Sequence, residues 1–116
     1  MHSKETFQKA IADELPHFMR VFESIPQDKE REVVQMAQQA MGLLALLKTD
    51  SVEVAAGQEI NSFAAAVVVF RQAFEELPAV AVNVSDQDWA TREETATHLL
   101  LNLVHRRDQL ASDTIS

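Results

Sequence analysis

The sequence lacks cysteine altogether and contains only two glycines and three prolines. Without cysteine, a disulfide framework, a thiolate metal site and a cysteine nucleophile are all excluded. No apolar run approaches the ~18 residues that a membrane-spanning helix needs, and the first residues lack the apolar segment of a secretory signal. We therefore expect a soluble, cytoplasmic protein.

Basic residues are also scarce, with ten lysines and arginines against eighteen acidic residues and a formal net charge of -8. Such a surface repels phosphate backbones and anionic lipids, so we expect neither nucleic acid nor a membrane as a partner. The one basic pair of note, Arg106-Arg107, is followed at once by Asp108 and is too small for a phosphate-binding track. The acidic surplus is best interpreted as a solvated surface.

Common catalytic motifs are missing as well. There is no Gly-x-Ser-x-Gly elbow and no glycine-rich phosphate loop. The adjacent pairs Glu75-Glu76 and Glu93-Glu94 point to different faces of a helix, which favours solvated carboxylates over an acid/base pair. The sequence therefore identifies no catalytic residue.

Four segments contain apolar residues at alternating spacings of three and four, the pattern of amphipathic helices. We predict helices over residues 4–24, 28–48, 52–77 and 91–111. Few glycines and prolines, together with four stripes of similar length, favour an all-α, antiparallel four-helix bundle. The bundle forms a single domain over residues 1–116, and 47% apolar residues are enough to close its core.

Turn and capping residues suggest where the first three helices begin. Pro16 predicts a kink in the first helix, or its division into two short helices. Asp28 is placed to cap the second helix. The third helix begins at a capping box formed by Asp50 and Glu53, or after Gly57.

Similar signals suggest how the third helix ends and the fourth begins. Pro78 is expected to end the third helix, because a proline removes one backbone hydrogen bond. Residues 79–84 then form an ordered connection whose valines, together with Trp89, close one end of the core. Thr91 and Glu94 have the spacing of a capping box and predict the start of the fourth helix.

Several segments also resemble one protein family. Residues 98–110 read HLLLNLVHRRDQL, which resembles the last core helix of the DinB-like (DinB/YfiT) metalloenzymes, where the pattern is His-x-x-x-His-Arg-Gly-Gln-Leu. Residues 18–29 and 37–47 are similar to that family's first and second helices, and residues 83–89 to its loop before the fourth. The resemblance covers most of the chain and implies the family's four-helix bundle.

The resemblance further implies that the family's metal site is largely lost. Of the histidine ligands only His105 remains, while Leu101 and Leu46 stand at the other two ligand positions. An aliphatic side chain cannot coordinate a cation, so we expect no metal or other cofactor. Leu46 and Leu101 are then expected to face each other across the bundle interior, at the vacated site.

Two hypotheses about function remain. The first is a non-catalytic bundle that binds a second copy of itself as a homodimer, or a protein partner, or a small apolar ligand. The second is a divergent metal-dependent hydrolase or thiol transferase that holds zinc or nickel with His105 and ligands outside the family pattern. Those further ligands would come from His17, His98, Glu94 and Asp108.

For the first hypothesis, the second and third helices are the expected binding surfaces, because their apolar stripes are broad. Small side chains on both helices permit close approach, within the monomer or between protomers. These residues are Ala37, Ala40, Ala45, Ala64, Ala65 and Ala66.

Overall fold

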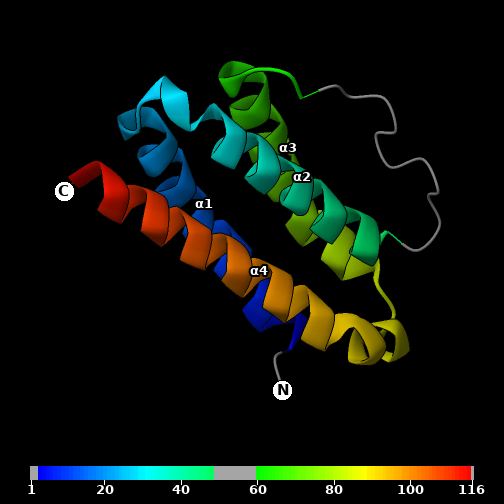
Figure 1. Cartoon of the computed structure of the whole chain (residues 1–116). Coiled ribbons are helices and arrows are strands. Elements are labelled where there is room, and N and C mark those ends of the chain that lie inside the picture. The colour runs from blue at the N-terminus through cyan, green and yellow to red at the C-terminus, as the bar shows by residue number, and fades with distance from the viewer. Residues whose placement is uncertain (1–2, 49–59, 116) are drawn as a thin grey trace.

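The computed structural model of the chain describes residues 3–48 and 60–115. Those residues form α-helices and one 3₁₀ turn, with no strand among them, which confirms the all-helical prediction (Figure 1). The elements are α1 (Lys4–Ser24), η1 (Gln27–Lys29), α2 (Glu30–Leu47), α3 (Phe63–Asn83) and α4 (Asp86–Ile115).

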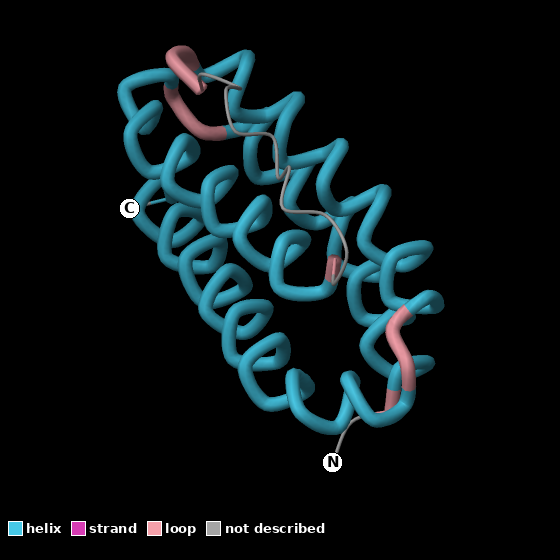
Figure 2. Tube along the Cα trace, turned by 90° about the vertical axis from the view of Figure 1, so that its right-hand side faces the viewer, coloured by secondary structure: helices cyan, strands magenta, loops and turns pink. Residues whose placement is uncertain are grey.

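The four helices pack side by side as a bundle (Figure 2), in which α1 and α2 each contact both α3 and α4. Arg92 Nη1 donates to the Leu46 carbonyl at 3.1 Å, so the start of α4 lies beside the end of α2. Gln8 Nε2 donates to the Pro78 carbonyl at 2.8 Å, which places the start of α1 beside the end of α3. The pairs α1/α3 and α2/α4 are therefore antiparallel.

The other two neighbouring pairs run in the same direction. Both α2 and α3 descend from the upper left to the lower right of Figure 1, and α1 and α4 ascend. Accordingly, the rings of Phe7 and Trp89, from the first turns of α1 and α4, lie 5.2 Å apart between centroids. The expected antiparallel order is thus wrong for α2/α3 and for α1/α4.

Four phenylalanines form the centre of the core. They occur at i and i+4 in α1 and again in α3, so each pair projects from one face of its helix. Phe70 stacks on Phe74 at 4.5 Å between ring centroids, and Phe18 lies 4.7 Å from Phe70. Phe22 meets Phe70 edge to face at 5.1 Å. Each such pair contributes about 0.5–1.5 kcal/mol beyond the area that it buries.

The N-terminal half of the chain differs from the sequence prediction mainly in its caps. The bounds of α1 match those predicted, and Pro16 lies inside one continuous helix, so a division into two helices is wrong. Asp28 lies in η1 rather than at the cap of α2, whose N-cap Lys29 makes no side-chain capping bond.

The third helix begins later and ends later than predicted. Residues 60–62 are not helical, and the Ser62 hydroxyl caps α3 by accepting from the Ala65 amide at 3.1 Å. The proposed signals at Asp50, Glu53 and Gly57 lie outside the described residues. At the other end α3 continues through Pro78 to Asn83, so the predicted stop is wrong.

Burial explains why α3 does not end at its proline. Ala81 and Val84 are fully buried, and unwinding the chain at Pro78 would expose both of them. Tertiary packing of a helix face commonly outweighs a local propensity, including the ~3 kcal/mol that an interior proline costs. Residues 79–83 are therefore helix rather than the expected connection.

The last helix starts at Asp86, ahead of the predicted Thr91. Ser85 caps it, because its hydroxyl accepts from the Asp88 amide at 3.1 Å. Thr91 instead lies within the helix, where its hydroxyl donates to the Gln87 carbonyl. Trp89 is buried in the first turns of α4, as expected of a residue that closes one end of the core.

Cations from other helices hydrogen-bond to the carbonyl ends of α2 and α3, neither of which has a basic residue in its last turn. The Arg92 guanidinium donates to the Leu46 carbonyl in the last turn of α2. Lys4 Nζ donates to the Val84 carbonyl at 2.6 Å, just beyond α3. Lys4 also lies 3.3 Å from an Asp86 carboxylate oxygen. Positive charge is favourable at a helix C-terminus, where free carbonyls and the helix dipole concentrate negative charge.

One charged side chain lies in the core of the described residues. Arg107 is only 8% exposed, although it belongs to the one basic pair of note in the sequence. Its guanidinium hydrogen-bonds to the Glu14 carboxylate of α1 and to Asp108 Oδ1 at 3.0 and 3.1 Å. The guanidinium carbon also lies 4.8 Å from the centroid of the Phe18 ring, a cation–π distance.

The partners of Arg107 keep it charged. Burial is the largest single influence and lowers its pKa, but hydrogen bonds and charge from Glu14 and Asp108 together raise the pKa above the ordinary arginine value. A raised pKa stabilises the fold at every pH below the ordinary pKa of arginine. That contribution is lost only when the pH rises through the raised pKa of Arg107. The ion pair between α1 and α4 therefore retains its cation at every pH near neutrality.

Gly42 provides a test of helix propensity. It is exposed in α2, and a Cβ built on it would meet no atom within 4 Å. We expect Gly42→Ala to raise the free energy of unfolding by about 0.5–1 kcal/mol, because glycine loses more backbone entropy in a helix. Urea unfolding followed by circular dichroism measures this. The matched control Ala90→Gly, at an exposed position of α4, should lower the free energy by a similar amount. A destabilised Gly42→Ala protein would contradict the open surface described at this position.

Removing Glu14 tests the buried ion pair. Glu14→Leu should lower the free energy of unfolding by about 1–3 kcal/mol, because the buried guanidinium then loses a charged acceptor. The double variant Glu14→Leu/Arg107→Met should recover most of that loss, since two apolar side chains of similar volume replace the pair. If the double variant is as unstable as Glu14→Leu alone, packing rather than charge explains the effect. Urea unfolding of the three proteins gives the comparison.

Candidate functional site

The histidines among the described residues lie on the surface. His17, His98 and His105 are all exposed. In residues 3–48 and 60–115, no group of three or more histidine, aspartate or glutamate side chains is close enough to hold one ion. The alternative site built from His105 with His17, His98, Glu94 or Asp108 is therefore not assembled in the described part of the chain.

The two leucines expected at the vacated metal site do not meet. Leu46 is half-buried beside the core, whereas Leu101 is 60% exposed. The interior face of α4 instead includes Leu100 and Leu103, and a step of one residue turns the side chain by about 100°. The prediction that Leu46 and Leu101 face each other is wrong, and the register that placed a lost ligand at Leu101 fails with it.

A groove of about 440 Å³ lies between α1 and α3. Its floor is formed by half-buried Leu15, Met19 and Val67, and its walls include exposed Pro16 and Val68. Val68 is 52% exposed and lies next to these half-buried apolar side chains.

The groove follows from the composition of α3. The polar residues of this 21-residue helix are Arg71, Gln72, Glu75, Glu76 and Asn83. A helix that is apolar around most of its circumference is usually buried on most sides. Here α3 packs mainly on α1 and α2, so Ala64, Val68, Ala79 and Val82 remain exposed on its outer side.

Charges of both signs line the rim of the groove. Arg71 Nε lies 3.3 Å from Glu75 Oε1, and both side chains are more than half exposed. Glu23 lines the groove from α1. An exposed pair of this kind contributes only a few tenths of a kcal/mol to folding, so its charges are readily re-paired with another molecule.

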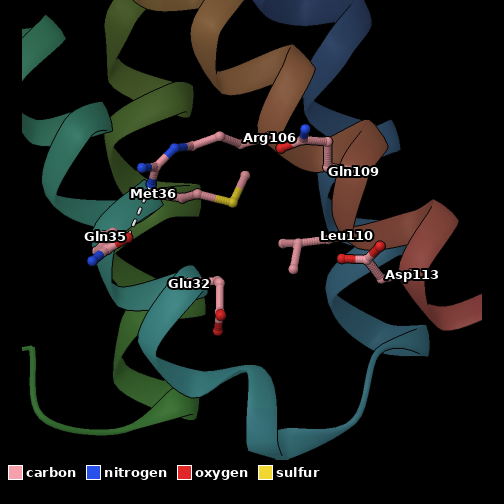
Figure 3. Close-up of a pocket in the computed structure, with 7 residues that line it drawn as sticks. All are labelled: Glu32, Gln35, Met36, Arg106, Gln109, Leu110 and Asp113. Atoms are coloured by element: carbon pink, nitrogen blue, oxygen red, sulfur yellow. Dashed lines mark hydrogen bonds between the residues drawn. The ribbon is translucent and has the colours of Figure 1, made fainter.

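A second, smaller pocket of about 180 Å³ lies between α2 and α4. Met36 and Leu110 line it, and both are buried in the core. Arg106 Nη1 donates to Gln35 Oε1 at 3.2 Å and so spans from α4 to α2 (Figure 3). Glu32, Gln109 and Asp113 complete the lining.

The described residues that line the groove and the pocket have aliphatic, methionine, proline, glutamine, arginine and carboxylate side chains. Among these residues no hydroxyl nucleophile lies next to an imidazole base.

The binding surfaces predicted on the second and third helices stay a prediction, and the outer side of α3 is exposed. Among the alanines expected to permit close approach, Ala37, Ala40 and Ala66 are fully buried and Ala64 is exposed. The pocket residues were missed, because only the antiparallel register of α2 and α4 brings them together.

None of the described helices is long and apolar enough to cross a membrane. Comparison of the chain with protein-family models, curated proteins and solved structures finds no match.

Proposed function

We propose that the protein is a self-associating helical bundle whose α1/α3 groove binds the same groove of a second copy. The observation that supports this is the outer side of α3, where Val68 is 52% exposed between half-buried apolar residues of two helices. Burying that surface against a second copy removes it from water, at about 25 cal/mol for each Å² of apolar area.

The dimensions of the face suit a dimer. Both α1 and α3 contain 21 residues, and at 1.5 Å rise per residue each is about 30 Å long. Two such helices side by side can supply the roughly 800 Å² per partner that a standard interface buries. The most common symmetry of soluble oligomers is twofold, in which one patch contacts itself.

The charges on the rim make the groove complementary to itself. The rim combines Arg71 with the carboxylates of Glu23 and Glu75, so a second copy of the same rim offers a charge of opposite sign to each of them. With two carboxylates against one guanidinium, the rim carries a single negative charge in excess. The net charge of -8 on each copy opposes association weakly, because screening at physiological salt limits its reach to about 8 Å.

The other sequence hypotheses have less support from the described residues. A metal-dependent hydrolase or thiol transferase needs ligands that the exposed histidines do not bring together. The DinB-like relationship stays a prediction, supported by the order of the matching segments and opposed by the outward position of Leu101.

Val68→Asp tests the proposed interface. The parent protein should sediment at twice the 13.0 kDa chain mass at micromolar concentration. Val68→Asp should weaken dimerisation at least about 100-fold, because twofold symmetry buries two unpaired carboxylates in each dimer. Analytical ultracentrifugation across a concentration series measures both, and circular dichroism checks that the variant is folded.

Val82→Asp is the matched control. Val82 is also exposed on α3, at 63%, but does not line the groove, so this variant should remain dimeric. A mass of 13.0 kDa for the parent protein at every concentration would overturn the proposal. Equal dissociation of both variants would place the interface elsewhere on α3.

A further inference from the structure

The outer face of α4 has a stripe of exposed side chains that includes two histidines. This helix packs mainly on α1 and α2 and lies along one edge of the bundle (Figure 1). Residues at spacings of three, four and seven share one face of a helix, because each residue turns the helix by about 100°. Leu101 is 60% exposed at the centre of this α4 stripe. The members of the stripe, all exposed, are Glu94, His98, Leu101, His105 and Asp108.

The α4 stripe contains two pairs of side chains that can bind a metal ion. Glu94 and His98 are four residues apart and form the first pair. His105 and Asp108 are three residues apart and form the second pair. Both hydrogen bonds from Arg107 to Asp108 end on Oδ1, so Oδ2 is available to a cation. No third histidine or carboxylate joins either pair among the described residues, whereas a zinc site takes at least three protein ligands. Each pair is therefore half of a site.

The two pairs lie symmetrically about Leu101. Glu94 and Asp108 are seven residues before and after it. His98 and His105 are three residues before and four after it. When a second α4 packs antiparallel with Leu101 against Leu101, the first pair of one copy lies level with the second pair of the other, to within about 1.5 Å along the axis. Both histidines lie on the same side of Leu101 around the helix, about 40° and 60° away, so a twofold axis brings them next to each other.

We propose that zinc joins two copies of the chain through their α4 stripes. Each dimer binds two zinc ions. Glu94 and His98 of one copy and His105 and Asp108 of the other hold each ion. Two imidazoles and two carboxylates give the four-coordinate, tetrahedral site that zinc prefers, whereas magnesium and calcium prefer oxygen ligands alone. A site closed by four protein ligands links the two chains and has no open position for a catalytic water.

The charges of the α4 stripe make this contact depend on the cation. The stripe contains two carboxylates and no lysine or arginine. Two metal-free copies would therefore place Glu94 of one opposite Asp108 of the other, and like charges repel. Zinc offsets these charges. Ala90 and Ser112, both exposed beyond the two ends of the stripe, come opposite each other in the same arrangement, and their small side chains permit close approach.

The zinc-dependent contact is separate from the proposed groove interface. The helices contact one another in the ring order α1, α3, α2, α4, so α4 lies diagonally opposite α3. The outer face of α4 and the α1/α3 groove therefore lie on different sides of the bundle. Val68→Asp, which removes the groove contact, leaves the α4 stripe intact. Failure of the groove dimer and failure of zinc bridging are thus separate outcomes.

Zinc chloride in slight molar excess, added to the full-chain Val68→Asp protein purified without an affinity tag, is the first test. Analytical ultracentrifugation should show twice the mass that the same protein has in EDTA, with a dimer dissociation constant below about 10 μM. Isothermal titration calorimetry should give one zinc per chain. Magnesium chloride should leave the mass unchanged. A mass that zinc does not change, with or without zinc binding, would overturn the proposal.

Two ligand variants in the Val68→Asp background test whether each ion is shared between copies. His98→Ala and His105→Ala each remove one ligand from both ions of a dimer, so each should weaken zinc-dependent association at least about 100-fold. An equimolar mixture of the two variants should form dimers again, because one of its two sites has all four ligands. The matched control His17→Ala, at an exposed histidine of α1, should dimerise in zinc like the Val68→Asp protein.

The mixture separates a shared site from adventitious zinc binding. Ions bound to scattered surface histidines would leave the mixture no heavier than either variant alone. Association that persists in both ligand variants, or that His17→Ala abolishes as well, would also overturn the proposal. Circular dichroism checks that every variant is folded.

Discussion

The arrangement of the bundle depends on the burial of one ring, that of Phe18. The ring contacts Phe22 of its own helix, Phe70 and Phe74 of α3, and the guanidinium of Arg107 from α4. A side chain enclosed by three helices fixes the rotation of α1 about its axis. Because the inward face of α1 is fixed, its outward faces are fixed too, and Leu15 and Met19 must line the edge toward α3.

The contact between Arg107 and the Phe18 ring explains how a charge is accommodated in an apolar core. Arg107 extends over the Phe18 ring to reach Glu14, so its hydrocarbon stem replaces an aliphatic residue while its head is hydrogen-bonded. Together with Phe7 and Trp89 nearer the start of both helices, this contact joins the parallel pair α1/α4. An ordinary leucine at position 107 would fill space without selecting a partner helix, whereas a charge requires its counterion at one register.

The sequence predicted those features that local periodicity determines. The stripe of apolar residues located α1 to the residue, because these residues repeat along one face of a single helix. Pro78 and Thr91 gave wrong helix bounds because each is a local signal. The burial of Ala81 and Val84 outweighs the effect of Pro78. The cap at Ser85 starts α4 before Thr91 is reached. Helix direction could not be read from periodicity, because a stripe is the same in either direction.

The two candidate sites differ in how far the sequence alone could predict them. The groove could be anticipated, because a helix as apolar as α3 has more apolar surface than two neighbours can cover. The pocket could not, since Gln35 and Arg106 are distant in the sequence and meet only through the α2/α4 register. Leu101 shows the limit of a sequence motif, because the resemblance predicted an inward ligand position there and the rotation of the helix turns the side chain to solvent.

The cations at the carbonyl ends of α2 and α3 have a consequence for cooperativity. Lys4 and Arg92 belong to α1 and α4, so each of these helix ends takes one hydrogen-bond donor from another helix. A fragment containing only α2 and α3 would lose both donors, and its last turns would fray. Local opening of α1 likewise releases the end of α3, so the helices are expected to unfold together in one transition rather than one by one.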